Sequence, residues 1–149
     1  MMESTSTGRP AQMMSFNDAV TNCLINNYMN FSGRASRSEY WFWTLFTFLV
    51  SFVSGIIDGF MFGSELGDPL WISNIIGVAI FLPGLAVIVR RLHDGGRSGW
   101  WFLLSFTIIG IIPLIIWMIM EGQAHPNEYG EVPTNIIVKK GNGIDYNNY

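Results

Sequence analysis

Residues 90–101 read RRLHDGGRSGWW and combine side chains that bind anions with side chains that move protons. Three of them are arginines, whose guanidinium groups bind phosphate or carboxylate through paired hydrogen bonds. His93 is a candidate general base if Asp94 orients it. Apolar sequence flanks the stretch on both sides, so a hydrophilic hinge between two helices is the third interpretation.

A second arginine segment, FSGRASRSEYWFW, occupies residues 31–43. If this segment is helical, Arg34, Arg37 and Trp41 lie on one face. Glu39 supplies a carboxylate in the same segment. Both segments place a glycine–arginine element a few residues before an apolar run that begins with tryptophan. This repeated arrangement indicates that the two segments act together.

Two non-catalytic hypotheses account for the arginines. In the first, Asp94 pairs with an arginine. Glu39 pairs with Arg37 or Arg34, and a polar network of Glu39, His93 and Asp94 ties the two segments together. In the second, the arginines bind the anionic headgroups of membrane lipids, as basic clusters beside a membrane do. The candidate lipid- or phosphate-binding residues are Arg34, Arg37, Arg90, Arg91 and Arg97.

The catalytic hypothesis uses His93 as a base oriented by Asp94. Adjacent residues rarely face each other on a helix, and no serine or cysteine nucleophile accompanies the pair at a suitable spacing. We therefore expect no enzymatic activity. We also expect no metal or other cofactor, because Cys23 is the only cysteine and the two histidines, His93 and His125, are expected on opposite sides of a membrane.

The composition is that of a membrane protein. Only 13% of the 149 residues are charged, against roughly 25% in a soluble domain. The net charge of −3 argues against nucleic acid as a partner. Three windows free of Asp, Glu, Lys, Arg and His, at 40–57, 69–89 and 98–120, predict transmembrane helices, since about 20 residues cross a bilayer. The first window is short, and extending it gives a span at about 40–62. The first span requires that Asp58 be tolerated near the interface.

The arginines predict the direction of insertion. Three arginines precede the first span and three lie between the second and third, whereas the loop between the first two spans has none. After the third span the first basic residues are Lys139 and Lys140. This distribution places the N-terminus and the 90–97 loop in the cytoplasm and the C-terminus outside.

The segment before the first span predicts a further helix. Residues 15–29 place apolar side chains at helical spacing, with asparagines on the opposite side. Ser15 and Asp18 fit the start of a capping box. We expect an amphipathic helix lying on the cytoplasmic interface. The predicted organisation is a disordered N-terminus at 1–14, an all-α membrane domain at 15–134 and a flexible C-terminal tail at 135–149.

Three motifs in order, GRASRSEYW, FLPGLAVIVRRLHDGGRSGWW and PNEYGEVP, resemble a family of small bacterial inner-membrane proteins of the YhaH type, a domain of unknown function. The resemblance covers about residues 25–134. It implies a multi-pass protein of the bacterial plasma membrane and supplies no reaction. By the predicted topology, PNEYGEVP follows the third span and lies outside.

Together these patterns predict an integral membrane protein that is a non-enzymatic accessory or scaffold. Its expected partners are membrane lipids, anionic ones in particular, and a second copy or a larger membrane protein. The alternative is a small transporter component that acts as an oligomer. A membrane enzyme acting on a phosphorylated lipid is the third hypothesis.

Overall fold

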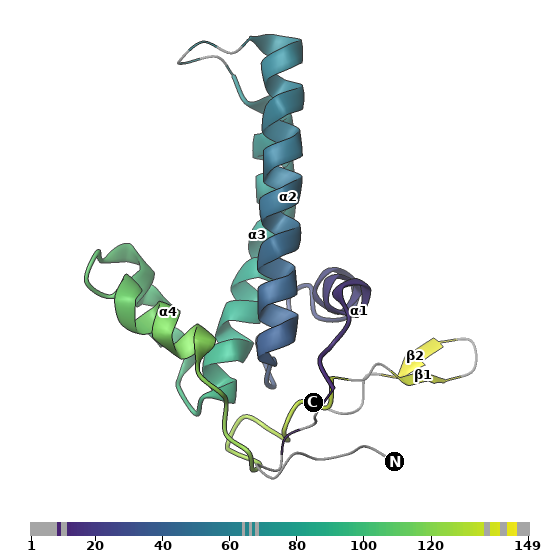
Figure 1. Ribbon diagram of the computed structural model, residues 1–149, viewed down its shortest axis with the longest axis vertical. Helices are drawn as coiled ribbons and strands as arrows, with labels where there is room; N and C mark the ends of the chain where they lie inside the picture. Colours follow the sequence, from purple (N-terminus) through teal and green to yellow (C-terminus); the bar gives the residue numbers. More distant parts are fainter. Residues whose placement is uncertain are drawn as a thin grey trace.

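The computed structural model describes residues 9, 12–63, 65, 67, 69–135, 138–140 and 143–145. A pair of long helices stands on a broader base formed by shorter elements (Figure 1). The buried apolar side chains gather at this base. One cluster contains Cys23, Ala35, Trp43 and Val87, and the other contains Leu92, Leu114 and Met118.

The long helices are α2, Arg37–Phe62, and α3, Trp71–Asp94. At about 1.5 Å per residue they are roughly 39 and 36 Å long, which exceeds the ~30 Å hydrocarbon core of a bilayer. Their most apolar windows have mean hydropathies of 1.9 and 2.4, and only 11% and 17% of those residues are buried. Within the described chain, these are the two helices that are long and apolar enough to span a membrane.

Asp58 is accommodated at the far end of α2 by the helix that follows. Its carboxylate is fully buried and accepts hydrogen bonds from the backbone N–H groups of Ile72, at 2.9 Å, and Ser73, at 2.7 Å. These N–H groups belong to the first turn of α3, where no partner within the helix exists. Asp58 therefore caps α3 from the neighbouring helix.

The third predicted span is not a single helix, and the prediction of three membrane-spanning helices is wrong for this structure. Residues 98–120 form a 3-10 helix, η2, at Gly99–Phe106, then a turn, and then a nine-residue helix, α4, at Ile111–Ile119. This hairpin leans away from the long helices (Figure 1). Neither limb has the length to cross a bilayer.

Gly110 and Pro113 explain why the helix breaks. In an uninterrupted helix the ring of Pro113 would clash with the carbonyl of residue 109, and its missing N–H would leave that carbonyl without a bond. In the first turn of a new helix, neither penalty applies. The turn is closed by Thr107, whose Oγ1 accepts a hydrogen bond from the N–H of Gly110 at 3.1 Å.

Both ends of the hairpin lie at the same end of α3. The N–H of Gln123 donates to the carbonyl of Asp94 at 2.8 Å, and the carbonyl of Met120 accepts a bond from Arg91. The prediction that the chain after residue 120 lies across the membrane from the 90–97 loop is therefore wrong. His93 and His125 lie at the same end of the molecule.

The N-terminal helical segment consists of α1, Phe16–Thr21, and a π-helical turn, η1, Asn22–Asn26. The Ser15 hydroxyl accepts from the N–H of Asp18 at 3.1 Å, as the capping box predicts. The expected amphipathic pattern holds only in part. Asn22 belongs to the side predicted to face water, yet it is fully buried because it bonds to Glu39.

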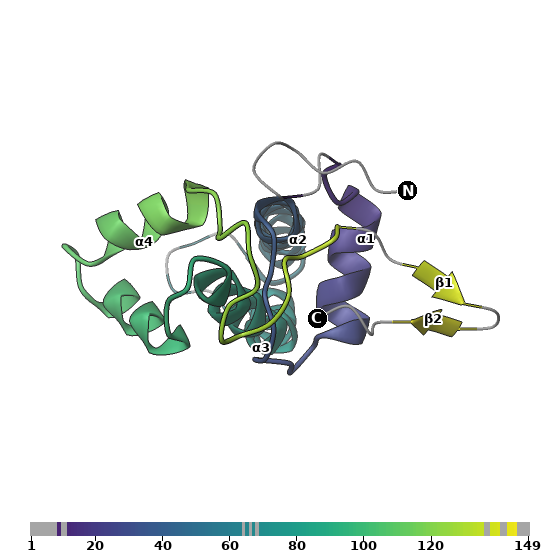
Figure 2. The ribbon, with the colours of Figure 1, turned by 90° about the horizontal axis from the view of Figure 1, so that it is seen from below.

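After α4, residues 121–135 cross beneath the ends of α2 and α3 (Figure 2). The tail carries a two-stranded antiparallel hairpin of β1, Val138–Lys140, and β2, Gly143–Asp145. Arg9 and Met14, from the N-terminus predicted to be disordered, are 7% and 2% exposed. Residues 1–8, 10 and 11, and the rest of the predicted tail, lie outside the described residues.

Candidate functional site: a buried arginine–carboxylate cluster at the base

Asp94 is the centre of the cluster. It ends α3, is fully buried, and accepts hydrogen bonds from three arginines. Arg9 Nη2 donates at 2.9 Å and Arg34 Nε at 3.0 Å, while Arg91 donates from one turn earlier on the same helix. One carboxylate thereby joins the N-terminal segment, the 31–36 loop and α3.

Arg34 extends the cluster to the chain that follows α4. Its guanidinium donates to the carbonyls of His125, at 2.8 Å, and Gln123 and Gly130, in addition to Asp94. The side chain is 1% exposed. A guanidinium carries five N–H donors, and here they are spread over a carboxylate and backbone carbonyls. Arg34 therefore holds residues 123–130 against the base.

Arg90 and Arg91 are adjacent but point in different directions because successive helical residues are about 100° apart. Arg91 faces Asp94 and the end of α4. Arg90 faces the start of α2, where its Nη1 lies 2.8 Å from Glu39 Oε1. The expected pairing of Glu39 with Arg34 or Arg37 does not occur.

The start of α2 explains the position of Glu39. Ser36 caps the helix by accepting a hydrogen bond from the N–H of Glu39 at 3.2 Å, which places Glu39 in the first turn. Arg37 is two residues earlier and thus on the opposite side of the helix. Arg37 instead pairs with Glu121 at 3.0 Å, and both side chains are about half exposed.

Glu39 also receives a hydrogen bond from Asn22 Nδ2 at 3.0 Å, and Cys23 Sγ lies 3.7 Å away. Burial, with the nearby Glu39 carboxylate, raises the pKa of the Cys23 thiol far above its usual range. Since the thiolate is the reactive form, Cys23 is an inert packing residue here.

His93 contacts backbone and an aromatic ring. Its Nδ1 lies 3.1 Å from the carbonyl of Gly33, and its ring stacks on Tyr129 with centroids 3.9 Å apart and planes 3° apart. Asn127 Nδ2 donates to the His93 carbonyl at 2.9 Å. Asp94 is engaged by the arginines, so the His93–Asp94 arrangement of the catalytic hypothesis is not formed.

Arg97 stands apart from the buried cluster. Its guanidinium carbon lies 4.5 Å from the ring centroid of Trp117 in α4, and its Nη1 donates to the Gly95 carbonyl at 3.1 Å. This cation–π contact connects the loop after α3 with the hairpin. Gly96 lies in the turn between α3 and η2 and has a φ of +70°, a conformation that favours glycine.

The buried charges of the base are mainly basic. Among the described residues at this end, Arg9, Arg34, Arg90 and Arg91 are buried against two buried carboxylates, Glu39 and Asp94. Backbone carbonyls and the negative end of the α3 dipole compensate part of this excess. No group of three His, Cys, Asp or Glu side chains that could hold a metal ion is present among the residues that the structure describes.

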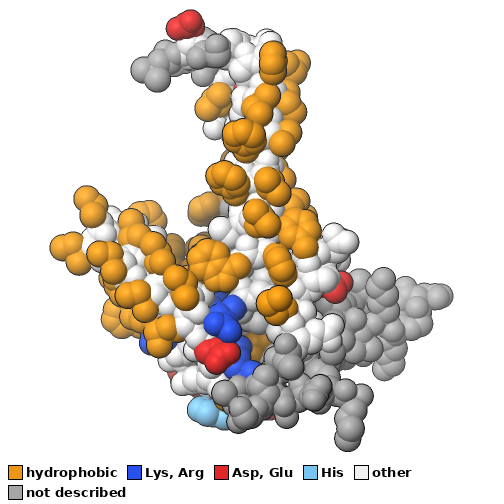
Figure 3. All heavy atoms as spheres, in the orientation of Figure 1, with side chains coloured by type: hydrophobic (Ala, Val, Ile, Leu, Met, Phe, Trp, Pro, Cys, Tyr) orange, Lys and Arg blue, Asp and Glu red, His pale blue; other side chains and the backbone are white. Residues whose placement is uncertain are grey.

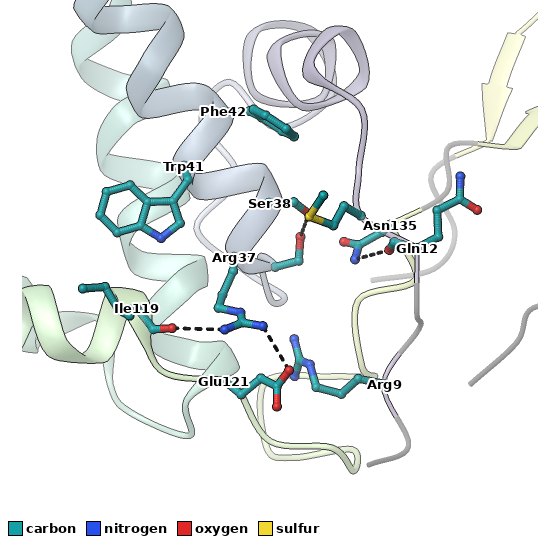
Figure 4. A pocket seen from close by; sticks show the side chains of 11 residues that line it. Arg9, Gln12, Arg37, Ser38, Trp41, Phe42, Ile119, Glu121 and Asn135 are labelled. Carbon is teal, nitrogen blue, oxygen red and sulfur yellow. Dashed lines mark hydrogen bonds and ion pairs between the residues drawn. The ribbon is translucent and has the colours of Figure 1, made fainter. Parts of the chain in front are cut away.

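A pocket of about 510 Å³ opens beside the cluster (Figure 4). Arg37 and Arg9 form one wall, and Ser36 and Ser38 present the start of α2. Four apolar side chains also line it. They are Met13, Trp41, Phe42 and Ile119. Gln12, Asn135 and Glu121, the partner of Arg37, line it as well, so the pocket combines charged and polar groups with apolar side chains.

Sequence reasoning named the two arginine segments but missed several members of the cluster. Arg9, Asn22, Gln123 and Tyr129 all contact it from segments assigned to tails or to the opposite side. The available signal was the isolated Arg9 in a segment otherwise poor in charge. The other signal was the polar PNEYG run directly after an apolar window.

Comparison with known proteins identifies a matching family and several relatives. The family described as protein of unknown function (DUF805) matches residues 28–131. Inner membrane protein YhaI of Escherichia coli (strain K12) is 41% identical over 111 residues, which are 74% of this chain and 91% of YhaI. Inner membrane protein YhaH of the same strain is 37% identical over 111 residues, 74% of this chain and 92% of YhaH.

A third relative, the uncharacterized protein YiiR of the same strain, is 32% identical over 95 residues, 63% of this chain and 56% of YiiR. No solved structure matches the chain. The matched region runs from Tyr28 to Glu131 and so contains Arg34, Glu39 and the whole of α3. The chain belongs to the DUF805 family and is a bacterial inner-membrane protein.

Proposed function

We propose that this protein is a non-enzymatic scaffold of the inner membrane that binds the headgroup of an anionic phospholipid in the pocket beside Arg37. The observation that carries the proposal is the pocket itself, which combines an accessible guanidinium with apolar walls at the end of a span. A phospholipid offers a partner for each, because its phosphate is negatively charged and its acyl chains are apolar. Guanidinium binds phosphate through paired hydrogen bonds.

The buried arginines have a different role in this proposal. Arg34, Arg90 and Arg91 are at most 1% exposed, so they do not reach a headgroup. They hold the start of α2 and the chain after α4 in fixed positions around the pocket. Of the five arginines that the sequence nominated for lipid binding, Arg37 is the one that lines the pocket.

The start of α2 adds to the attraction for an anion. Ser36 and Ser38 lie in the pocket wall at the N-terminus of a 26-residue helix, where the helix dipole is positive. Glu121 opposes this attraction because it shares the pocket and pairs with Arg37. A headgroup therefore competes with Glu121 for Arg37.

The test is retention of phosphatidylglycerol against phosphatidylethanolamine by the purified protein, measured by native mass spectrometry. Arg37→Gln is expected to lose about tenfold in phosphatidylglycerol binding, the effect of removing one charged hydrogen-bonding partner. Glu121→Gln, the matched variant that removes the competitor, is expected to bind more. Equal retention by the wild type and Arg37→Gln, both folded, would refute the headgroup site.

We further propose that the base faces the cytoplasm. The arginines of the N-terminal segment, the start of α2 and the end of α3 all lie there, whereas the loop between α2 and α3 has no basic residue. Residues 121–135 lie at the same end, so both flanks face the cytoplasm in this proposal. A reporter fused after Tyr149 is expected to be cytoplasmic, and a periplasmic reporter would contradict the two-span topology.

A further inference from the structure

The η2–α4 hairpin is apolar but only half as long as a span. Its eight-residue 3-10 limb is about 16 Å long and its nine-residue α-helical limb about 14 Å. The hydrocarbon core of a bilayer is about 30 Å thick. Even perpendicular to the membrane, a hairpin of these dimensions would reach about its middle and no further.

Both ends of the hairpin are fastened to the base. Gly99 lies so close to α3 that a Cβ there would come within 2.6 Å of Val89 Cγ1, so the first limb starts in direct contact with that helix. At the other end, Arg91 bonds to the Met120 carbonyl and Gln123 to the Asp94 carbonyl. Crossing the whole membrane would require breaking these buried contacts.

The hairpin packs only against the lower turns of the long helices. Leu114 and Met118 of α4 contact Leu92 and Ile88, near the end of α3, and Tyr40, near the start of α2. At the tip the exposed fractions are large. They are 78% for Phe106, 90% for Ile108 and 83% for Ile109. Figure 3 shows hydrophobic side chains over the hairpin, which stands apart from the upper part of the two long helices.

Because the spans cross the bilayer, the tip of the hairpin lies among acyl chains of the leaflet on the base side. At the base, the hairpin and α1 both lie beside α2 and α3, whereas the far half of the pair consists of α2 and α3 without such neighbours (Figure 1). The protein therefore occupies more area in one leaflet than in the other. Insertion confined to one leaflet is sensitive to membrane curvature.

We infer that the η2–α4 hairpin is a one-leaflet wedge and that the protein prefers membrane in which the base-side leaflet is convex. The partner is a lipid surface of defined curvature. In a convex leaflet the lipids are spread apart, so the extra area of the hairpin is accommodated with less compression. This inference does not involve Arg37 and is independent of the headgroup pocket.

The test uses the full chain, labelled at its C-terminus and reconstituted into giant vesicles from which narrow tethers are pulled. A membrane-impermeant quencher distinguishes molecules whose base faces outward from those whose base faces inward. Outward-facing molecules are expected to be enriched roughly twofold in the tether and inward-facing molecules to be depleted similarly. Equal density in tether and vesicle for both orientations would overturn the inference.

Two variants test whether the enrichment in tethers depends on the hairpin. Ile109→Asp places a short charged side chain, which cannot extend to the interface as lysine does, at a tip position that is exposed and packs against little. The tip is then expected to withdraw from the hydrocarbon, so that the protein has equal density in tether and vesicle. The melting temperature should stay within a few degrees of the wild-type value. Met61→Asp, near the far end of α2 and 65% exposed, is the matched control and keeps the enrichment.

Enrichment in Ile109→Asp equal to that of the wild type would contradict the wedge. The alternative is that the tip of the hairpin packs against a second copy of the chain instead of lipid. Cross-linking through Ile109→Cys in a Cys23→Ser background decides between the two. Monomers, with a label at position 109 accessible to lipid-soluble quenchers, support the wedge. Dimers joined at position 109 refute it.

Discussion

The two ends of the helix pair each bury a carboxylate, and the surroundings of the two are different. At the far end Asp58 accepts two backbone N–H bonds and has no arginine beside it. At the base Asp94 receives three arginines from three segments. The far carboxylate therefore closes one turn between neighbouring helices. The base carboxylate holds together Arg9, Arg34 of the 31–36 loop and Arg91 of α3.

This difference assigns the two ends different roles. The far end needs only to reverse the chain and cap α3, which a single short side chain does. The base presents a pocket and a hairpin in fixed geometry, and this requires bonds between segments far apart in the sequence. Disturbing these contacts should therefore affect the two ends unequally, and four substitutions test that expectation.

Asp94→Asn should have the largest effect. It removes the carboxylate that Arg9, Arg34 and Arg91 share and leaves their charges buried without compensation. Breaking a buried ion pair from one side costs about 3–5 kcal/mol. Thermal unfolding in detergent should show a large fall in melting temperature, with early release of residues 121–135 in hydrogen exchange. A change no larger than that of the exposed Glu121→Gln would contradict the central role of Asp94.

Gly122→Ala should have the next largest effect. A Cβ at Gly122 would overlap the Asp94 carboxylate and approach its backbone carbonyl, so the cluster must shift. Such overpacking costs about 1–3 kcal/mol. Gly59→Ala in α2 is the matched control, since nothing lies within 4 Å of its added Cβ. We expect Gly59→Ala to raise the melting temperature slightly and Gly122→Ala to lower it.

Asp58→Ala should be milder than Asp94→Asn. It leaves the N–H groups of Ile72 and Ser73 without their acceptor, and loss of such a cap costs about 0.5–2 kcal/mol. Faster exchange confined to the first turn of α3 is the expected observation. If Asp58→Ala destabilises the protein as much as Asp94→Asn does, the comparison between the two ends fails.

Tyr129→Ala should have the smallest effect of the four. It removes the ring stacked on His93, a contact worth about 0.5–1.5 kcal/mol. Tyr129→Phe keeps the ring and is the control. Limited proteolysis should cleave the 125–131 segment faster in Tyr129→Ala than in wild type or Tyr129→Phe. Identical cleavage in all three would show that Arg34 and Asn127 alone hold the segment.

Several features were readable from residue order alone because their physics is local. The apolar runs of α2 and α3 require burial in lipid over the length of a span, whatever lies beside them. The caps at Ser15 and Ser36 involve partners three residues away. The break in the third apolar window was not readable in this way, because Pro83 lies inside the unbroken α3, whereas the chain turns at Gly110, just before Pro113.

The partners of the charged side chains were not readable in the same way. Glu39 had arginines nearby in sequence, yet it pairs with Arg90, 51 residues away. Arg9 lies 85 residues from Asp94, and the chain after α4 was expected on the other side of the membrane. These pairings depend on the direction in which each helical side chain points and on the return of the chain after α4 to the base. Neither leaves a periodic pattern.

The sequence by itself determined that this is a helical membrane protein with its arginines gathered at one end. Hydrophobic length and the positions of charge are properties of the chain, and the bilayer acts on them directly. Only the tertiary structure decided that the third apolar window folds into a short hairpin and that four arginines share two carboxylates. The reason is that buried charges must be paired, and the partner is set by which segments meet in space.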